Sequence, residues 1–375
     1  MNAKQLLYAL NDINDTYIED AEIKNRRTQP DVLKALGILA ACIALVLSLW
    51  GISTKLLSQP RTVPPANTNN NADLPMLAIS EAMSGKGEAS YFAYDISELT
   101  GTGTDWEFSL LPVFRNPLDY RDGSILHADR DQMLRLLKET AQRFGINESA
   151  DMAIERPSDD TPGDETFSMR SEDYLIEVNS FSRVNVTLLN RHAASTLRLS
   201  PSADKKELQT VAAATIKQFA SILAMSAPTI ILPRGDYDVN GQQKWNRFFV
   251  YESSGNTTAG FLNVQFHAVE FFFDESGALA GLSWGVPDLT QCIGEYPLLT
   301  QQQAIAAACK AFDLNEQDIL RAELFYHTES TDAFFVPCYR FYVQTDDTNI
   351  AASLPGMHTY TTYILPAVLP EYIRS

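Results

Sequence analysis

Residues 35–54 constrain this chain more than any other segment, because none of these twenty residues is charged. Ala35–Ile52 reads ALGILAACIALVLSLWGI, and the nearest charged neighbours are Lys34 and Lys55. A helix of this length rises about 30 Å, which matches the hydrocarbon core of a bilayer. A buried core helix seldom runs this far without a polar face. The pattern therefore predicts a transmembrane helix over 35–54, in contact with membrane lipid.

The basic residues around this segment predict its orientation. They are Lys24, Arg26, Arg27 and Lys34 on the N-terminal side, against Lys55 and Arg61 on the other. Basic residues stay on the cytoplasmic side of a membrane. We therefore expect a single-pass protein of the cell membrane, with residues 1–34 cytoplasmic and the C-terminal domain extracytoplasmic.

Cys42 raises an alternative form of anchor. Leu39-Ala40-Ala41-Cys42 is similar to the lipobox of bacterial lipoproteins, in which the cysteine is lipidated after cleavage of the leader. The residues after Cys42 stay apolar, whereas a mature lipoprotein begins with a polar tether. This favours an unmodified intramembrane cysteine, and lipidation of Cys42 stays open.

The charge balance excludes one class of partner. The 375 residues hold 29 basic and 47 acidic side chains, a net charge of −18. Residues 1–34 hold five basic and six acidic residues, so the remainder has 24 basic and 41 acidic residues, or −17. Nucleic-acid binding needs clustered Lys and Arg, so we expect no nucleic-acid partner. With 45% hydrophobic and 20% charged residues, the chain has the composition of a folded protein.

The tail 1–34 carries a candidate partner-binding stripe, made of Leu6, Leu7, Leu10 and Ile13. These residues share one face if the segment is helical, and acidic residues occupy the other positions. A helix this short is marginal in water, so it needs an apolar contact to persist. We expect a cytoplasmic or membrane protein, or a second copy of the chain, to cover the stripe. The alternative is a leader that serves membrane insertion alone.

The remaining chain divides into a linker and an α+β ectodomain. Residues 55–75 are rich in Pro and Asn, which predicts an extended linker. Residues 76–200 are expected to form a first α+β unit, and 201–375 a second region with two further helix-sheet units. The expected fold class is therefore α+β, with a single N-terminal transmembrane helix followed by repeated helix-on-antiparallel-sheet units.

Periodicity predicts the individual elements. Helices are expected over 130–144, 203–225 and 301–312, and Thr300 and Gln303 have the spacing of a capping box. A hairpin is expected around Asp274-Glu275-Ser276-Gly277. Strands are expected over 174–189, 229–232, 248–251, 264–273, 279–284, 322–327, 334–343 and 359–365.

The third helix-sheet unit resembles a known module. LTQQQAIAAACKAF, followed by strands ending YRFYVQTDD and then TYTTYILPAV, is similar to PepSY-like or cystatin-like modules of bacterial extracytoplasmic proteins. The layout of tail, span and tandem modules resembles the YycH/YycI-type regulators. LLYALNDINDTYIEDA is similar to tails of Firmicute membrane proteins that accompany extracytoplasmic-function sigma factors. Zinc-binding anti-sigma domains use a His and Cys cluster, which residues 1–34 lack. The resemblance implies a regulator and transfers no catalytic residue.

The most specific metal motif is Asp236-Tyr237-Asp238-Val239-Asn240-Gly241. Asp236, Asp238 and Asn240 match the first half of a calcium loop, so they are weak candidate metal ligands. The twelfth position of such a loop is a bidentate Glu, but here it is Arg247. A hairpin turn at Asn240-Gly241 fits the apolar flanks better. We therefore expect no cofactor, with calcium as the weaker possibility.

The remaining reactive residues show no catalytic pattern. The five histidines (His127, His192, His267, His327, His358) are dispersed, without metal-ligand spacing. Outside the span the cysteines are Cys292, Cys309 and Cys338, which allow at most one disulfide; reduced, packed thiols are favoured and pairing stays open. No phosphate loop or nucleophile elbow is present, so we expect no catalytic residue, although an activity is not excluded.

These observations predict a membrane-anchored extracytoplasmic sensor, regulator or protein-interaction module without chemistry of its own. One alternative is a cell-envelope hydrolase that uses two ectodomain carboxylates. The other is a calcium-dependent binding module. Sequence does not identify the ligand, the partner or the oligomeric state.

Overall fold

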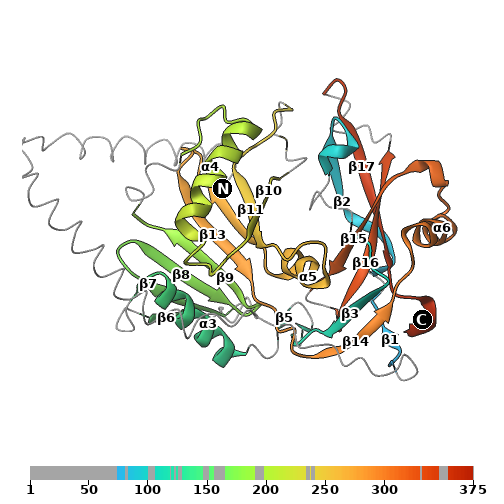
Figure 1. Ribbon diagram of the computed structural model, residues 1–375, viewed down its shortest axis with the longest axis horizontal. Helices are drawn as coiled ribbons and strands as arrows, with labels where there is room; N and C mark the ends of the chain where they lie inside the picture. The colour runs from blue at the N-terminus through green and yellow to red at the C-terminus, as the bar shows by residue number, and fades with distance from the viewer. Residues whose placement is uncertain are drawn as a thin grey trace, which may run out of the picture. The chain divides into compact units, whose positions relative to one another are not determined.

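Figure 1 shows the computed structural model of this 375-residue chain. The chain divides into two compact units, Met1–Arg61 and Thr62–Ser375. All described residues belong to the second unit, so the predictions for the tail 1–34 and the span 35–54 lie outside the described residues. The structure describes residues 74–80, 83–99, 106–118, 120–121, 124–125, 129–146, 152–155, 165–190, 198–233, 237, 241–329, 332–345 and 354–374.

The larger sheet has eight strands. These are β6 (Met152–Glu155), β7 (Thr166–Arg170), β8 (Tyr174–Asn179), β9 (Arg183–Leu188), β10 (Pro228–Ile231), β11 (Arg247–Glu252), β12 (Val269–Phe273) and β13 (Leu279–Gly285). Their order is β10-β11-β12-β13-β9-β8-β7-β6, and every neighbouring pair is antiparallel. On β12, buried Val269, Phe271 and Phe273 alternate with half-buried Glu270 and Phe272. The sheet therefore has one core face and one more polar face.

Two helices, α3 (Arg130–Arg143) and α4 (Lys205–Phe219), pack on the core face of this sheet. The first contacts β7 and β8, and the second contacts β10 and β11 (Figure 1). Each begins at an aspartate whose side chain accepts a backbone N–H of the first turn: Asp129 from Gln132, and Asp204 from Glu207. The caps satisfy donors that a helix start otherwise leaves unpaired. Both helices lie within the predicted ranges.

The second sheet contains six strands. These are β2 (Gly85–Ala93), β3 (Leu110–Arg115), β14 (Cys292–Pro297), β15 (Ile319–His327), β16 (Phe334–Thr345) and β17 (His358–Pro366). Their order is β14-β3-β16-β17-β2, and β15 pairs with β16. The helix α6 (Gln301–Phe312) contacts β15, β16 and β17. Its predicted bounds and its capping box between Thr300 and Gln303 are confirmed.

The helix α5 (Thr258–Phe266) was expected in part as a strand. It connects β11 to β12 of the eight-stranded sheet, yet its side chains belong to the core of the six-stranded sheet. Its buried residues include Phe261, Leu262, Val264 and Phe266, which point in different directions around the helix. Because these apolar residues are spread around the helix instead of along one stripe, periodicity does not separate the segment from a strand.

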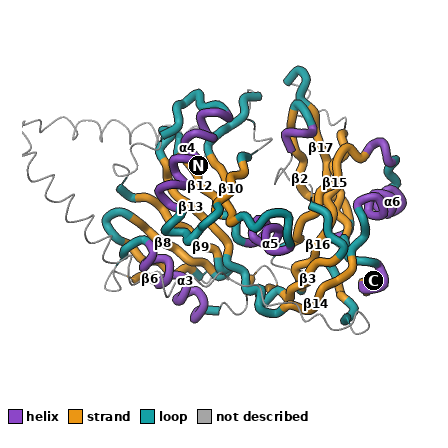
Figure 2. The backbone as a smooth tube through the Cα atoms, in the orientation of Figure 1, coloured by secondary structure: helices purple, strands orange, loops and turns teal. Residues whose placement is uncertain are grey.

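The remaining strands and helices are short. Figure 2 shows helices, strands and loops along the backbone. A parallel two-stranded sheet joins the two ends of the folded unit. The smaller strands are β1 (Leu77–Ala78), which pairs with β18 (Ile373–Arg374), and β4 (Tyr120–Arg121), which pairs with β5 (Ser124–Ile125). The 3-10 helices are η3 (Ile96–Leu99), η4 (Glu316–Asp318) and η6 (Pro370–Tyr372).

The hairpin predicted around Gly277 is confirmed between β12 and β13. Asp274 Oδ1 accepts the backbone N–H groups of Ser276 at 2.9 Å and Ala278 at 3.1 Å. Gly277 has a φ of 76°, and a Cβ at this position would lie 2.0 Å from the carbonyl oxygen of Leu199. Only glycine tolerates both the positive φ and this close approach to Leu199 without strain.

The expected fold class requires correction. The described residues form four α-helices and eighteen strands, so this part of the chain is largely β instead of a series of helix-on-sheet repeats. Among the described residues, no helix combines the length and the apolar character needed to cross a bilayer. The expected transmembrane helix therefore has no counterpart among the described residues. Residues 35–54, for which it was expected, lie outside them. The eight-stranded sheet draws strands from both sides of residue 200, because β9 pairs with β13.

Candidate functional site

The floor of the candidate site is the face of the eight-stranded sheet that does not belong to its core. Phe249 on β11 lies opposite Glu270 on β12, and Glu270 lies opposite Ser283 on β13. Ser283 in turn lies opposite Asn185 on β9. Directly opposed residues of antiparallel strands share one face, so these four side chains form a row across four strands.

Polar contacts join this row to two arginines. Arg183 Nε donates to Ser283 Oγ at 2.8 Å, and Ser283 Oγ donates to Asn185 Oδ1 at 2.7 Å. Glu270 lies between the two guanidinium groups, with Oε2 3.4 Å from Arg183 Nη2 and Oε1 3.7 Å from Arg247 Nη1. Arg183 keeps half of its side-chain surface exposed, whereas Glu270 keeps 20%. Arg183 therefore places a guanidinium group beside this row. The group is held by Ser283 and is still accessible to solvent.

A cleft of about 630 Å³ lies above this floor. Its walls come from the end of α5, the loop after β3, and residues at the β15–β16 turn. The residues that line these walls include Val264, Gln265, Phe266, Ala268, Thr328 and Phe335. Phe266 and Phe335 are 6% and 4% exposed, with ring centroids 5.7 Å apart. The cleft therefore combines an aromatic wall with a polar floor, a composition typical of small-ligand sites.

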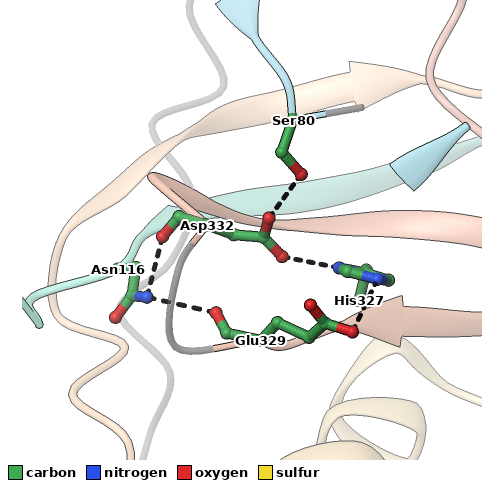
Figure 3. Close-up of polar contacts among 5 residues, drawn as sticks. All are labelled: Ser80, Asn116, His327, Glu329 and Asp332. Atoms are coloured by element: carbon green, nitrogen blue, oxygen red, sulfur yellow. Dashed lines mark hydrogen bonds and ion pairs between the residues drawn. The ribbon is translucent and has the colours of Figure 1, made fainter. Parts of the chain in front are cut away.

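A buried histidine–carboxylate pair fixes the turn between β15 and β16 (Figure 3). His327 is 4% exposed, and its Nδ1 lies 2.5 Å from Oδ2 of Asp332, which is 2% exposed. Ser80 Oγ donates to the other carboxylate oxygen of Asp332 at 2.6 Å. Asn116 Nδ2 donates to the backbone carbonyls of Asp332 at 2.8 Å and Glu329 at 3.4 Å. Because Asn116 and Thr328 also line the cleft, this network supports one of its walls.

The geometry of this cluster differs from that of a catalytic triad. In a triad the serine hydroxyl hydrogen-bonds to Nε2 of the histidine, whose Nδ1 is held by the aspartate. Here Ser80 donates to the aspartate instead, and His327 Nε2 lies 3.6 Å from Oε1 of Glu329. The serine therefore contacts the aspartate, and not the histidine that serves as the base in a triad. The arrangement joins the segment after β1, the end of β3 and the β15–β16 turn, which is a structural role.

The predicted site residues lie apart from this cleft. Leu6, Leu7, Leu10 and Ile13 lie outside the described residues, as do Asp236, Asp238 and Asn240. Near the proposed calcium loop, Tyr237 and Gln243 form an antiparallel bridge and Gly241 has a φ of 74°, which agrees with a chain reversal there. Within the described ranges, no three His, Cys, Asp or Glu side chains gather in a way that suits a metal ion.

Sequence reasoning missed the cleft and the His327–Asp332 pair. The row on the floor joins residues up to 100 positions apart, such as Arg183 and Ser283, so no local motif marks it. A weak indication was available in β9, where Arg183, Asn185 and Thr187 alternate with apolar residues. His327 and Asp332 are five positions apart, and nothing in that spacing indicates a pair.

The cysteines give a prediction about reactivity. Cys292, Cys309 and Cys338 carry free thiols, as favoured by the sequence. Burial, and then the nearby Asp332 carboxylate, raise the pKa of the fully buried Cys338 thiol far above its ordinary value. The thiolate is the reactive form, so we expect Cys338 to resist a disulfide exchange reagent at pH 8 until the chain unfolds.

This expectation is measured by mass spectrometry of labelled peptides, with half-buried Cys309 as the internal control. In native buffer Cys309 should be labelled first, and Cys338 should be labelled only after urea is added. Equal labelling of both thiols in the native protein would contradict the burial of Cys338.

Comparison with known proteins reveals distant likeness only. No protein-family model and no curated protein matches this chain. Similar solved structures include an uncharacterized protein from Eubacterium rectale, with 10% identity and a TM-score of 0.36, covering 70% of this chain and 86% of that one. The C-terminal domain of Bacillus megaterium YpeB is 12% identical with a TM-score of 0.21, covering 57% of this chain and 87% of that one. At these TM-scores neither likeness carries an argument about fold family or function.

Proposed function

We propose that this chain is a ligand-binding sensor or regulator that acts through the cleft and performs no chemistry of its own. The observation that carries this proposal is the cleft itself. Its volume of about 630 Å³ lies within the range of small-ligand sites, roughly 300–1,000 Å³. Aromatic side chains of the wall face a small number of fixed polar groups on the floor, a pairing that gives both affinity and orientation.

The contacts that the reactive side chains make also support a binding role. His327 and Asp332 are buried and hold a turn, and Ser80 donates to Asp332. Glu270 lies between two arginines and contacts both, so its carboxylate is held by neighbouring side chains.

The test is ligand binding by the full chain, measured by thermal unfolding with a set of neutral and charged aromatic small molecules. A ligand at 100 times its Kd adds about 2.7 kcal/mol to the free energy of unfolding, which gives a clear rise in Tm. Ala268→Trp should abolish the rise, because the larger side chain would occupy the cleft.

Ala268→Ser serves as the matched control, since it changes the same position without filling space. It should bind as the unaltered chain does, and both variants should have similar Tm values without ligand. The proposal fails if no compound raises the Tm, or if Ala268→Trp responds as strongly as Ala268→Ser.

Two further expectations stay predictions. The first is that a protein partner binds the tail through Leu6, Leu7, Leu10 and Ile13. Recovery of partners with a Leu7→Asp/Leu10→Asp variant tests this, and the variant should lose the partner.

The second is the location of the folded domain outside the cytoplasm. It is testable by protease added to intact cells after removal of the wall. Digestion of the domain would support that location, and its protection would contradict it.

A further inference from the structure

The guanidinium of Arg183 has hydrogen-bonding capacity that the protein does not use. Its Nε donates to Ser283, and its Nη2 makes a loose contact of 3.4 Å with Glu270. Its Nη1 has no partner among the described residues. Charge-assisted hydrogen bonds are usually about 2.7–2.9 Å long, so the Glu270 contact leaves Nη2 available as well. Half of the side-chain surface is exposed at the edge of the cleft.

Gln265, on the wall formed by the end of α5, provides a second donor. Its Oε1 accepts the backbone N–H of Tyr326 at 3.0 Å, which fixes the orientation of the amide. The acceptor atom is thereby occupied, and the Nε2 donors have no partner among the described residues. Gln265 lines the cleft and is half-buried. Both available polar groups, on Arg183 and on Gln265, are therefore donors, which favours a ligand rich in acceptors.

The guanidinium of Arg183 favours an anionic acceptor. Its acidic neighbour Glu270 is shared with a second arginine, because the Glu270 carboxylate lies 3.4 Å from Arg183 and 3.7 Å from Arg247. Asp288 also lines the cleft, but its Oδ1 accepts the backbone N–H of Thr290 at 2.9 Å, and it forms no ion pair with Arg183 in the described part of the chain. A ligand carboxylate at Arg183 would therefore meet a cation whose contact with Glu270 is long and shared, close to an apolar wall.

We propose that the cleft binds a carboxylate attached to an apolar, aromatic body. The carboxylate accepts from Arg183 and Gln265, and the body packs against Phe266, Phe335 and Phe249. This inference rests on the proposed function and adds the chemical class of the ligand. The same chemistry occurs in small aromatic acids and at the C-terminus of a peptide that ends in an aromatic residue.

The test compares 4-phenylbutyrate with 4-phenylbutyramide by calorimetric titration of the full chain. The two probes share an apolar body and differ in charge. A charge-assisted hydrogen bond contributes about 1.5–3 kcal/mol, so the acid should bind about 10- to 100-fold more tightly than the amide. Arg183→Ala should abolish this preference while retaining the binding of the amide. Arg183→Lys should keep part of it, because the charge remains and the second donor is lost.

Arg170→Ala is the matched control, since Arg170 is an exposed arginine of the same sheet that does not line the cleft. It should leave the preference unchanged. Equal binding of acid and amide, or a preference that survives Arg183→Ala, would overturn the inference and leave the proposed binding function standing. If neither probe nor any other aromatic compound binds, the proposed function itself fails.

A second pair of probes identifies the source of the carboxylate. The peptide Ala-Ala-Ala-Phe is titrated with a free C-terminus and with an amidated one. Tighter binding of the free peptide than of phenylbutyrate would assign the cleft to peptide C-termini. Binding of phenylbutyrate alone would assign it to small acids.

Discussion

Asp332→Ala should lower the free energy of unfolding by about 2 to 4 kcal/mol, because it leaves two hydrogen-bonding groups without a partner at about 1 to 3 kcal/mol each. Asp332 is 2% exposed, and its carboxylate accepts from both His327 and Ser80. The substitution leaves both of these polar groups without their partner, His327 in the buried interior and Ser80 in a half-buried position. Urea unfolding of the full chain, followed by tryptophan fluorescence, measures the loss.

Two variants separate the parts of this effect. Ser80→Ala removes one hydrogen bond and should cost about 1 kcal/mol. Asp332→Asn keeps the shape of the side chain but removes the charge, so its cost should fall between the two. If His327 and Asp332 served catalysis instead of the fold, Asp332→Ala should be neutral or stabilising, because functional groups are often held at the expense of stability. A loss below 1 kcal/mol would therefore contradict the structural role.

Phe261→Ala should lower the free energy of unfolding by about 3 to 5 kcal/mol through the cavity it leaves. Phe261 lies on α5 with no exposed surface, and its ring packs against Trp106 and Phe108, each at a centroid distance of 5.3 Å, and Tyr326 at 5.7 Å. Because α5 is part of the chain between two strands of one sheet while its side chains fill the core of the other, the loss should destabilise both sheets together.

The control for this prediction is Phe261→Leu, which retains most of the volume and should cost less than about 1.5 kcal/mol. Leu320→Ala provides a surface comparison, because Leu320 is 45% exposed and should change stability by no more than about 0.5 kcal/mol. Urea unfolding monitored by fluorescence and by far-UV circular dichroism should give coincident transitions. Separate transitions for Phe261→Ala would show that α5 does not couple the two sheets.

Local patterns predicted the elements whose stability is encoded nearby. The helix α6 begins at a capping box between Thr300 and Gln303, three residues apart, so its start is specified by its own sequence. The turn at Asp274–Gly277 is likewise set by an aspartate side chain and a glycine with positive φ. In both cases the hydrogen bonds connect residues within one turn, and a single sequence contains all the information required.

The floor of the cleft illustrates the opposite case. Phe249, Glu270, Ser283 and Asn185 become neighbours only through the register of β11, β12, β13 and β9. A shift of one residue in any of these pairings would place its side chain on the core face, so the site depends on strand pairing over as many as 98 residues. Alternation along β9 and β12 indicates a polar face, but it does not indicate which strands lie beside each other.

The sequence by itself determined the acidic charge of −18, the positions of α3 and α6, and the hairpin turn at Gly277. These properties depend on composition or on contacts within a few residues. Tertiary structure alone decided that the segment Thr258–Phe266 is a helix, since its apolar residues follow no helical stripe and the surroundings select the conformation that buries them. It also decided that Arg183 lies in a cleft and that His327 meets Asp332, because long-range packing brings the walls and floor together and removes these groups from water.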